Sequence, residues 1–140
     1  MKAKICYTII YGPYDSLKEP KIITPEWKYI CFTDQSFTSD VWEIRPIPED
    51  LMNKFERKPV KRQRILKIQP HLYLEDYEVC IYVDGTITIN VDLNQAIEDM
   101  KKECGDFEIC IPVHPMRRCI YREGRIVTII KKDVEDIVKP

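Results

Sequence analysis

The sequence EVCIYVDGTITIN, Glu78 to Asn90, joins a short apolar run to one carboxylate in a Gly-Thr turn. The run Val79–Val83 is nearly continuous, which is typical of a central strand covered on both faces. Asp84 is the first charge after this run. Ligands of open α/β sheets bind at the carboxyl ends of strands, where Gly85 would let them approach the backbone closely. The pattern therefore predicts a metal, phosphate or sugar site at Asp84.

Two other interpretations apply to the same residues. Asp84 and Gly85 are also common in hairpin turns, in which case Thr86–Ile89 would be the returning strand, and local sequence does not decide between them. The segment also resembles the first motif of haloacid-dehalogenase-type phosphatases, in which a nucleophilic Asp stands two residues before a second Asp. Here the nucleophile's position is Tyr82. A phenol cannot form an acyl phosphate, which excludes that chemistry.

Length and composition indicate one globular domain over residues 1–140, and apolar strands that end in an acid or a turn favour the α/β class. Apolar residues make up 44% and charged residues 32%, with a formal net charge of -1, so neither disorder nor a nucleic-acid partner is expected. No segment approaches the roughly 20 apolar residues that span a membrane, so no transmembrane segment is expected. The start of the chain, Met1 to Tyr11, lacks the apolar core and cleavage site of a signal peptide and is expected to form a strand.

The cysteines bear on the cellular compartment. There are six, none in a Cys-x-x-Cys pair, and four lie in apolar runs: Cys6, Cys31, Cys80 and Cys110. This distribution favours buried free thiols in a reducing, cytoplasmic compartment. The alternative, which an even number of cysteines allows, is a disulfide framework in a secreted protein.

Further elements are predicted from periodicity and capping residues. Strands are expected at Ala3–Tyr11, Trp27–Thr33 and Val41–Ile47, because these segments are rich in β-branched and aromatic residues or alternate in polarity. Asp92 and Gln95 have the spacing of a capping box, so a helix is expected from there to Cys104, ending at Gly105.

A basic segment, Lys54 to Lys67, holds seven basic residues and one acid. A helix beginning near Pro59 would carry most of this charge. Arg64 and Lys67 are the candidates to reach a diphosphate. The other basic residues are expected to form a solvated face whose aliphatic stems cover apolar surface. Aromatic residues are not interleaved through the segment, as they would be in a platform for single-stranded nucleic acid.

A second polar group follows Phe107–Val113, which is expected to be another apolar strand. His114 comes directly after it and before a proline, with Arg117 and Glu123 within ten residues. These side chains offer a metal ligand or base, a guanidinium for a diphosphate and a carboxylate. A purely structural role for His114 is the alternative. For His71 a structural role, as a capped or half-buried ring, is expected.

The order of these motifs resembles the glycosyltransferase-like domain of plant mucilage-related and pollen turgor proteins and of many bacterial proteins, formerly a domain of unknown function. The motifs span nearly the whole chain. They are Tyr11-Gly-x-Tyr-Asp15, Cys31-Phe-Thr-Asp34, Trp42-x-Ile44, Lys67-x-x-Pro70-His71, Tyr82-Val-Asp-Gly-Thr-Ile87 and His114-Pro-x-Arg-x-Cys-Ile-Tyr-x-Glu123.

The resemblance implies a GT-A-like fold, a mixed sheet flanked by helices, and a nucleotide-sugar donor. It implies that Asp84 binds a divalent metal, Mn²⁺ or Mg²⁺, and that Asp84, His114 and Glu123 are the catalytic candidates. The implied substrate-binding residues are Tyr11, Gly12, Tyr14, Asp15 and Asp34 around the nucleotide, Arg64 and Lys67 at the phosphates, and Arg117, with His114 and Glu123, near the sugar or acceptor.

Two departures from the family pattern are evident. Thr86 stands where the metal-binding Asp-x-Asp of GT-A enzymes has its second acid. A full GT-A domain is commonly much longer, so the chain is expected to be a truncated or minimal member. The expected function is metal-assisted glycosyl transfer to an unknown glycan, lipid or protein acceptor. The alternative is a non-catalytic module on the same fold that binds a nucleotide, a glycan or a protein, or that binds RNA through the basic segment.

Overall fold

The computed structural model describes residues 2–55 and 58–112. Backbone packing divides the chain into two compact units, Met1–Asp99 and Met100–Pro140. In the described residues the elements follow the order β1 (Ala3–Ile10), β2 (Trp27–Thr33), β3 (Glu43–Pro46), α1 (Glu49–Lys54), α2 (Pro59–Ile68), the 3₁₀ helix η1 (Pro70–Leu72), β4 (Tyr77–Tyr82) and α3 (Leu93–Cys104). None of the described helices combines the length and apolar character needed to cross a bilayer.

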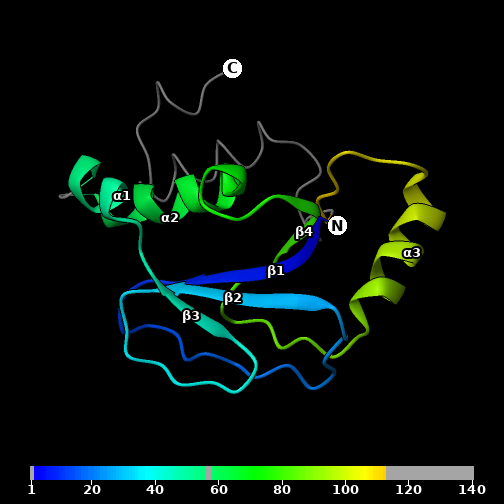
Figure 1. The fold of residues 1–140 in the computed structure, drawn as a ribbon, viewed down its shortest axis with the longest axis horizontal. Helices are drawn as coiled ribbons and strands as arrows, with labels where there is room; N and C mark the ends of the chain where they lie inside the picture. The colour runs from blue at the N-terminus through cyan, green and yellow to red at the C-terminus, as the bar shows by residue number, and fades with distance from the viewer. Residues whose placement is uncertain (1, 56–57, 113–140) are drawn as a thin grey trace, which may run out of the picture. The chain divides into compact units, whose positions relative to one another are not determined.

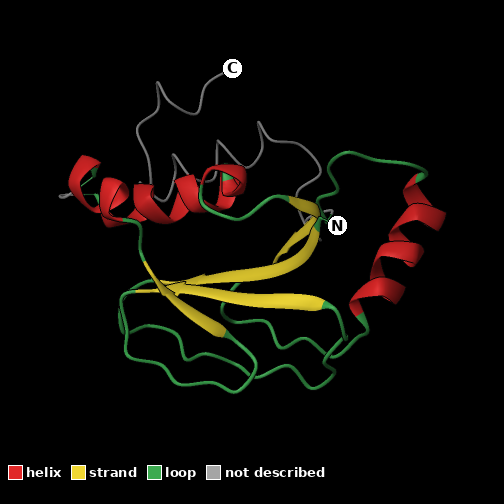
Figure 2. Ribbon diagram, viewed as in Figure 1, coloured by secondary structure: helices red, strands yellow, loops and turns green. Residues whose placement is uncertain are grey.

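The first unit is built on a four-stranded sheet with the order β3-β2-β1-β4 (Figure 2). Each neighbouring pair of strands is parallel. The chain proceeds outward from β1 through β2 to β3, then returns to place β4 on the other side of β1. All four carboxyl ends consequently lie at one edge of the sheet.

Strand β1 alternates its side chains between two apolar layers, as the two-residue period of a strand requires. Ile5, Tyr7 and Ile9 join one buried cluster, which also contains Leu51 of α1 and Leu66 of α2. Figure 1 shows α1 and α2 lying together over this face. Burial of both faces explains why β1 reads as a continuous apolar run.

The opposite face of the sheet is covered by loops and by the start of α3. Cys6 and Ile10 of β1 pack there with Trp42, Ile89 and Leu93. The tryptophan is fixed by a hydrogen bond from its indole Nε1 to the carbonyl of Lys18, at 3.0 Å.

Three predicted helix boundaries are confirmed. Pro59 occupies the first turn of α2, where a missing amide hydrogen costs little. At α3 the Asp92 carboxylate accepts a hydrogen bond from the Gln95 amide at 3.0 Å. The Gln95 side chain bonds Asp99 instead of returning to residue 92, so only half of the capping box forms. Gly105 ends the helix at φ +70° with its amide bonded to Lys101.

The expectations about the strands are met only in part. Among the described residues β4 lies at an edge of the sheet and is half-buried, while β1 and β2 are central. The described pairs of strands are all parallel, and the mixed sheet that the resemblance implies stays a prediction. Residues 107–112 form no strand, and Ile109 and Ile111 are 77% and 75% exposed, because a short apolar run becomes a strand only where a neighbour pairs with it.

The expectations about the burial of the thiols and of His71 are met only in part. Cys6 and Cys31 are buried as expected, and burial raises the pKa of each thiol to about 12. Cys110 is exposed, contrary to expectation, because the predicted strand around it is not formed. His71 is exposed in η1 and is not half-buried.

Arg62 is the one buried cation among the described residues and is 4% exposed. Its guanidinium donates to the carbonyls of Met52 and Phe55, at 3.0 and 3.1 Å, and to the hydroxyl of Tyr11 at 2.6 Å. Those two carbonyls lie at the end of α1, where helical carbonyls have no partner within the helix. Arg62 thus joins α1 and α2 to the loop that follows β1.

We predict that Arg62→Met lowers the free energy of unfolding by about 3 kcal/mol, because the partly buried carbonyls of Met52 and Phe55 lose their donor while the apolar stem is largely retained. Urea denaturation measures the change. Lys61→Met, at an exposed neighbour on the same helix, is the matched control and is expected to change stability by about 0.5 kcal/mol or less. Equal effects of the two substitutions would contradict the structural role of Arg62.

Candidate functional site

The carboxyl edge of the sheet contains a topological switch point. Strand β1 is flanked by β2 on one side and β4 on the other, so the loops after β1 and β4 leave the sheet at neighbouring positions. The strand order reverses at β1, and in parallel α/β sheets ligands bind outside the carboxyl ends of the strands at such a reversal. Asp84 lies two residues after the end of β4, at this edge, as the sequence predicts.

The loop after β1 is tied to the loop after β2. Asp34 Oδ1 accepts hydrogen bonds from the Gly12 amide at 2.8 Å and from Gln35 Nε2 at 2.9 Å. Partial burial raises the pKa of Asp34, but the bonds from Gln35, Gly12 and its own amide together hold the pKa below its ordinary value. Gly12 adopts φ +78°, and a side chain there would also meet the ring of Tyr14 at 3.1 Å.

The loop after β1 also contacts the loop after β4. A β-carbon on Gly85 would lie 3.0 Å from Ile10 Cγ1 and 3.6 Å from an oxygen of Asp15. Gly85 is therefore required for close packing rather than for an unusual φ. The Ile87 amide donates to the Asp84 carbonyl at 2.9 Å, which closes a turn. Residues 86–89 form no returning strand, so the hairpin interpretation is wrong.

The Asp84 carboxylate lies in a small polar cluster. Its Oδ1 accepts a hydrogen bond from the Tyr82 hydroxyl at 2.8 Å and a charged one from Lys67 Nζ at 3.4 Å. The side chain of Asp84 is 58% exposed and that of Lys67 is 49% exposed. Lys67 Nζ also lies 4.4 Å from the centre of the Tyr82 ring, a cation–π distance. Asp84, Tyr82 and Lys67 thus form one contact group, which we call the Asp84 cluster.

The Asp84 cluster is fixed to the core through aromatic contacts. The Tyr82 ring meets the Tyr7 ring edge to face, with centroids 5.3 Å apart. The Tyr7 hydroxyl donates to the carbonyls of Leu66 and Lys67 at the end of α2, each at 3.2 Å. Burial raises the pKa of Tyr82, and the hydrogen bond to Asp84 and the charges of Asp84 and Asp15 raise it further. The Tyr82 phenol therefore remains a hydrogen-bond donor at neutral pH.

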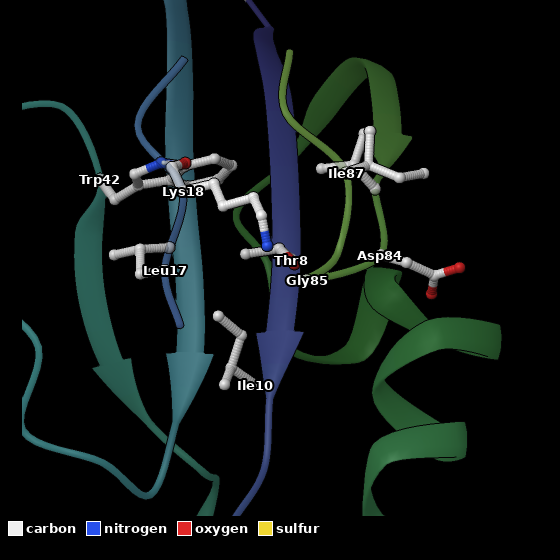
Figure 3. Close-up of a pocket in the computed structure, with 9 residues that line it drawn as sticks. Thr8, Ile10, Leu17, Lys18, Trp42, Asp84, Gly85 and Ile87 are labelled. Carbon is white, nitrogen blue, oxygen red and sulfur yellow. Dashed lines mark hydrogen bonds between the residues drawn. The ribbon is translucent and has the colours of Figure 1, made fainter. Parts of the chain in front are cut away.

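A cavity of about 10 Å³ lies behind the Asp84 turn, on the other face of the sheet. Thr8, Lys18 and Gly85 are among its lining residues. Thr8 Oγ1 is buried there and has no hydrogen-bond partner among the described residues. The cavity is about the size that one water molecule needs. Asp84 also lines this cavity, but Figure 3 shows its carboxylate directed away from Thr8 and Lys18.

A larger, open depression of about 390 Å³ lies at the ends of β2 and β3. Asp34 and Gln35 contribute its polar side, and Ile44, Ile47 and Met52 contribute apolar surface. The depression therefore shares Asp34 with the loop contacts described above. It is large enough for a planar ring system together with part of a sugar.

The structure brings most of the predicted site residues to this edge. Gly12, Asp15, Asp34, Lys67 and Asp84 lie in the contacts just described. Tyr11 is half-buried with its hydroxyl held by Arg62, Tyr14 is exposed beside Gly12, and Arg64 is exposed one turn before Lys67 on α2. His114, Arg117 and Glu123 lie outside the described residues.

Sequence patterns do not reveal the roles of Tyr82, Arg62 and Thr8. Tyr82 stands two residues before Asp84, and because residues two apart on a strand share a face, this spacing is the signal that could pair the phenol with the carboxylate. Arg62 has no local feature that distinguishes it from its exposed neighbours in the basic segment. Thr8 carries no signal, because the surroundings of its hydroxyl come from residues distant in sequence.

Comparison with known proteins finds no matching family model, no matching curated protein and no matching solved structure.

We predict that Asp34→Asn lowers stability at neutral pH and that this difference disappears in acid. A carboxylate with a depressed folded pKa contributes stability above its unfolded pKa, about 3.9, and loses that contribution as the pH falls through the folded pKa. Urea denaturation of both proteins at pH 7 and below pH 3 tests this, with Asp40→Asn as an exposed control. A difference that persists unchanged in acid would contradict the role of the Asp34 charge.

Proposed function

We propose that this chain is a glycosyltransferase of the GT-A kind, which binds a nucleotide-sugar donor at the carboxyl edge of its sheet. The observation that carries the proposal is the Asp84 cluster at the switch point between β1 and β4. There the Asp84 carboxylate contacts the Tyr82 hydroxyl at 2.8 Å and the Lys67 ammonium at 3.4 Å, and the ammonium lies 4.4 Å from the centre of the Tyr82 ring. This is the place where parallel α/β sheets bind ligands. The motif resemblance in the sequence supports the same function independently of this geometry.

The charges of the site suit a diphosphate and a cation together. Lys67 can donate to phosphate oxygens as a flexible point charge. Gly12 and Gly85 let the loops of the site pack closely, since a side chain at Gly12 would meet Tyr14 and one at Gly85 would meet Ile10. Asp34 and the adjoining depression are suited to the nucleoside, because they combine a carboxylate that can accept from hydroxyls with an apolar surface for a ring.

The donor set is compatible with the divalent ion that the resemblance implies. The described part of the chain holds no group of three or more His, Cys, Asp or Glu side chains arranged around a metal. Mg²⁺ in phosphate-binding sites, however, is commonly held by only one or two carboxylates together with the phosphates. Asp84 and Asp15 provide two, both close enough to Tyr82 for their charges to raise its pKa. The Lys67 ammonium already occupies one cation position beside Asp84.

Each residue of the site has a defined part in the proposed transfer. Asp84 and Asp15 would hold the ion, which when bound supplies positive charge that stabilises the departing diphosphate. Tyr82 orients the Asp84 carboxylate through its hydrogen bond. Lys67 adds positive charge to the leaving group. His114, Arg117 and Glu123 remain candidates for the sugar and acceptor side on the basis of the resemblance alone.

A non-catalytic module that binds a nucleotide, glycan or protein is the second candidate. Thr86 favours this candidate, because it stands where the metal motif has its second acid. The two available carboxylates, Asp84 and Asp15, therefore come from separate loops. Hydrolysis of a nucleotide sugar in the presence of Mn²⁺ separates the candidates. Binding without any turnover would favour the module. An RNA partner is not part of the proposal, because Arg62 of the basic segment is buried against α1.

The proposal also includes a cytoplasmic location and a glycan, lipid or protein acceptor. The location is supported by the free thiols of Cys6 and Cys31 in the core, since oxidising compartments favour disulfides.

We predict that a nucleotide sugar with Mn²⁺ raises the melting temperature of the wild-type protein and has little effect on Asp84→Asn. A ligand at 100 times its dissociation constant stabilises the folded state by about 2.7 kcal/mol. Asparagine keeps the shape and an acceptor for Tyr82 but removes the charge that attracts the ion. A thermal-shift screen of uridine and guanosine diphosphate sugars measures the effect.

The matched control is Asp76→Asn. Asp76 precedes β4, at the opposite end of the same strand, and pairs with Lys2 on the surface. This variant is expected to respond to the ligands like the wild type. An equal response of Asp84→Asn and the wild type would remove Asp84 from the binding site.

A further inference from the structure

We propose that Lys67 is an internal counter-ion of the site: it pairs with Asp84 in the ligand-free protein, competes there with a divalent cation, and transfers to the diphosphate when the donor binds. This inference rests on the proposed function and adds an order of charge exchange to it. The same side chain then weakens binding of the metal alone and strengthens binding of the diphosphate alone.

The geometry places the lysine where a bound cation would be attracted. Lys67 Nζ lies 3.4 Å from Asp84 Oδ1, the same oxygen that accepts the Tyr82 hydrogen bond. A second cation at this carboxylate must either displace the ammonium or bear its repulsion at short range. Competition between the two cations follows from their shared partner.

The lysine is held loosely enough to exchange. Both side chains of the pair are about half exposed, and exposed ion pairs are weak because water screens them. When its ion pair with Asp84 is broken, the Lys67 ammonium still faces the Tyr82 ring, with Nζ 4.4 Å from the ring centre, and is not released into solvent. Tyr82 can therefore keep Lys67 beside the site while its charge turns from Asp84 to a phosphate.

The lysine is also anchored at its backbone. The Lys67 carbonyl accepts a hydrogen bond from the buried Tyr7 hydroxyl at 3.2 Å, so the end of α2 is fixed to the central strand. Only the side chain needs to move. A lysine stem with its rotatable bonds allows this, whereas the carboxylate is kept in position by the Tyr82 phenol.

The experiment compares Lys67→Met with the wild type in two separate titrations. Mn²⁺ alone, followed by electron paramagnetic resonance of the free ion, is expected to bind Lys67→Met about fivefold more tightly. Inorganic pyrophosphate alone, followed by calorimetry, is expected to bind the same variant about tenfold more weakly. Lys67→Arg, which keeps the charge, should resemble the wild type in both titrations. Lys61→Met removes an equal charge from the same helix and should also leave both affinities unchanged.

The outcomes separate this inference from the proposed function. If Mn²⁺ binds Lys67→Met no more tightly than the wild type, while Asp84→Asn still weakens Mn²⁺ binding, the counter-ion role is wrong and the metal assignment stands. If Asp84→Asn does not weaken Mn²⁺ binding at all, the metal assignment of the proposed function fails as well. An equal gain in Lys61→Met would reduce the effect to general electrostatics and would overturn the specific pairing. Circular dichroism of each variant establishes that the fold is retained.

Discussion

The parallel pairing of β1 with a strand on each side is the constraint on which the rest of the structure depends. β1 is hydrogen-bonded to β2 from Lys4 to Ile10 and to β4 from Ala3 to Tyr7. Because all three strands run the same way, their following loops must meet at one edge. Gly12, Asp34, Gly85 and the Asp84 cluster are then brought together by strand register, although they are widely separated in sequence.

Much of this fold could be predicted from the sequence, and the exceptions have physical causes. β1 and β2 were recognisable because both faces are buried, and α3 because Asp92 and Gly105 have capping chemistry that is local. Strand order is not local. The apolar run before Asp84 was expected at the centre of the sheet, but β4 pairs only with β1 in the described residues. An apolar run indicates burial without indicating which neighbours provide it, and residues 107–112 failed as a strand for the same reason.

The part of the site that could be predicted is the set of charged residues that follow strand ends. Asp34 and Asp84 could be placed at the sheet edge because each directly follows an apolar run. Their partners could not be derived, because contacts such as Gly12 with Asp34 and Lys67 with Asp84 cross between elements. Arg62 illustrates the limit most clearly. It lies within a basic helix and would be assigned to solvent, yet its guanidinium caps the end of α1. Only the packing of α2 on α1 distinguishes it from Lys61.

The central claim is that a nucleotide binds at the carboxyl edge of the sheet, with its diphosphate at the Asp84 cluster and its nucleoside at Asp34, and mapping the bound position tests it most directly. Nitrogen–proton NMR correlation spectra of the labelled protein, recorded during titration with uridine or guanosine diphosphate and Mg²⁺, report on each backbone amide. The account predicts that the amides of Gly12, Asp34 and Gly85 shift together with one saturation curve. Shifts confined to α3 or to the amino edge of the sheet, or no shifts with either nucleotide, would contradict it.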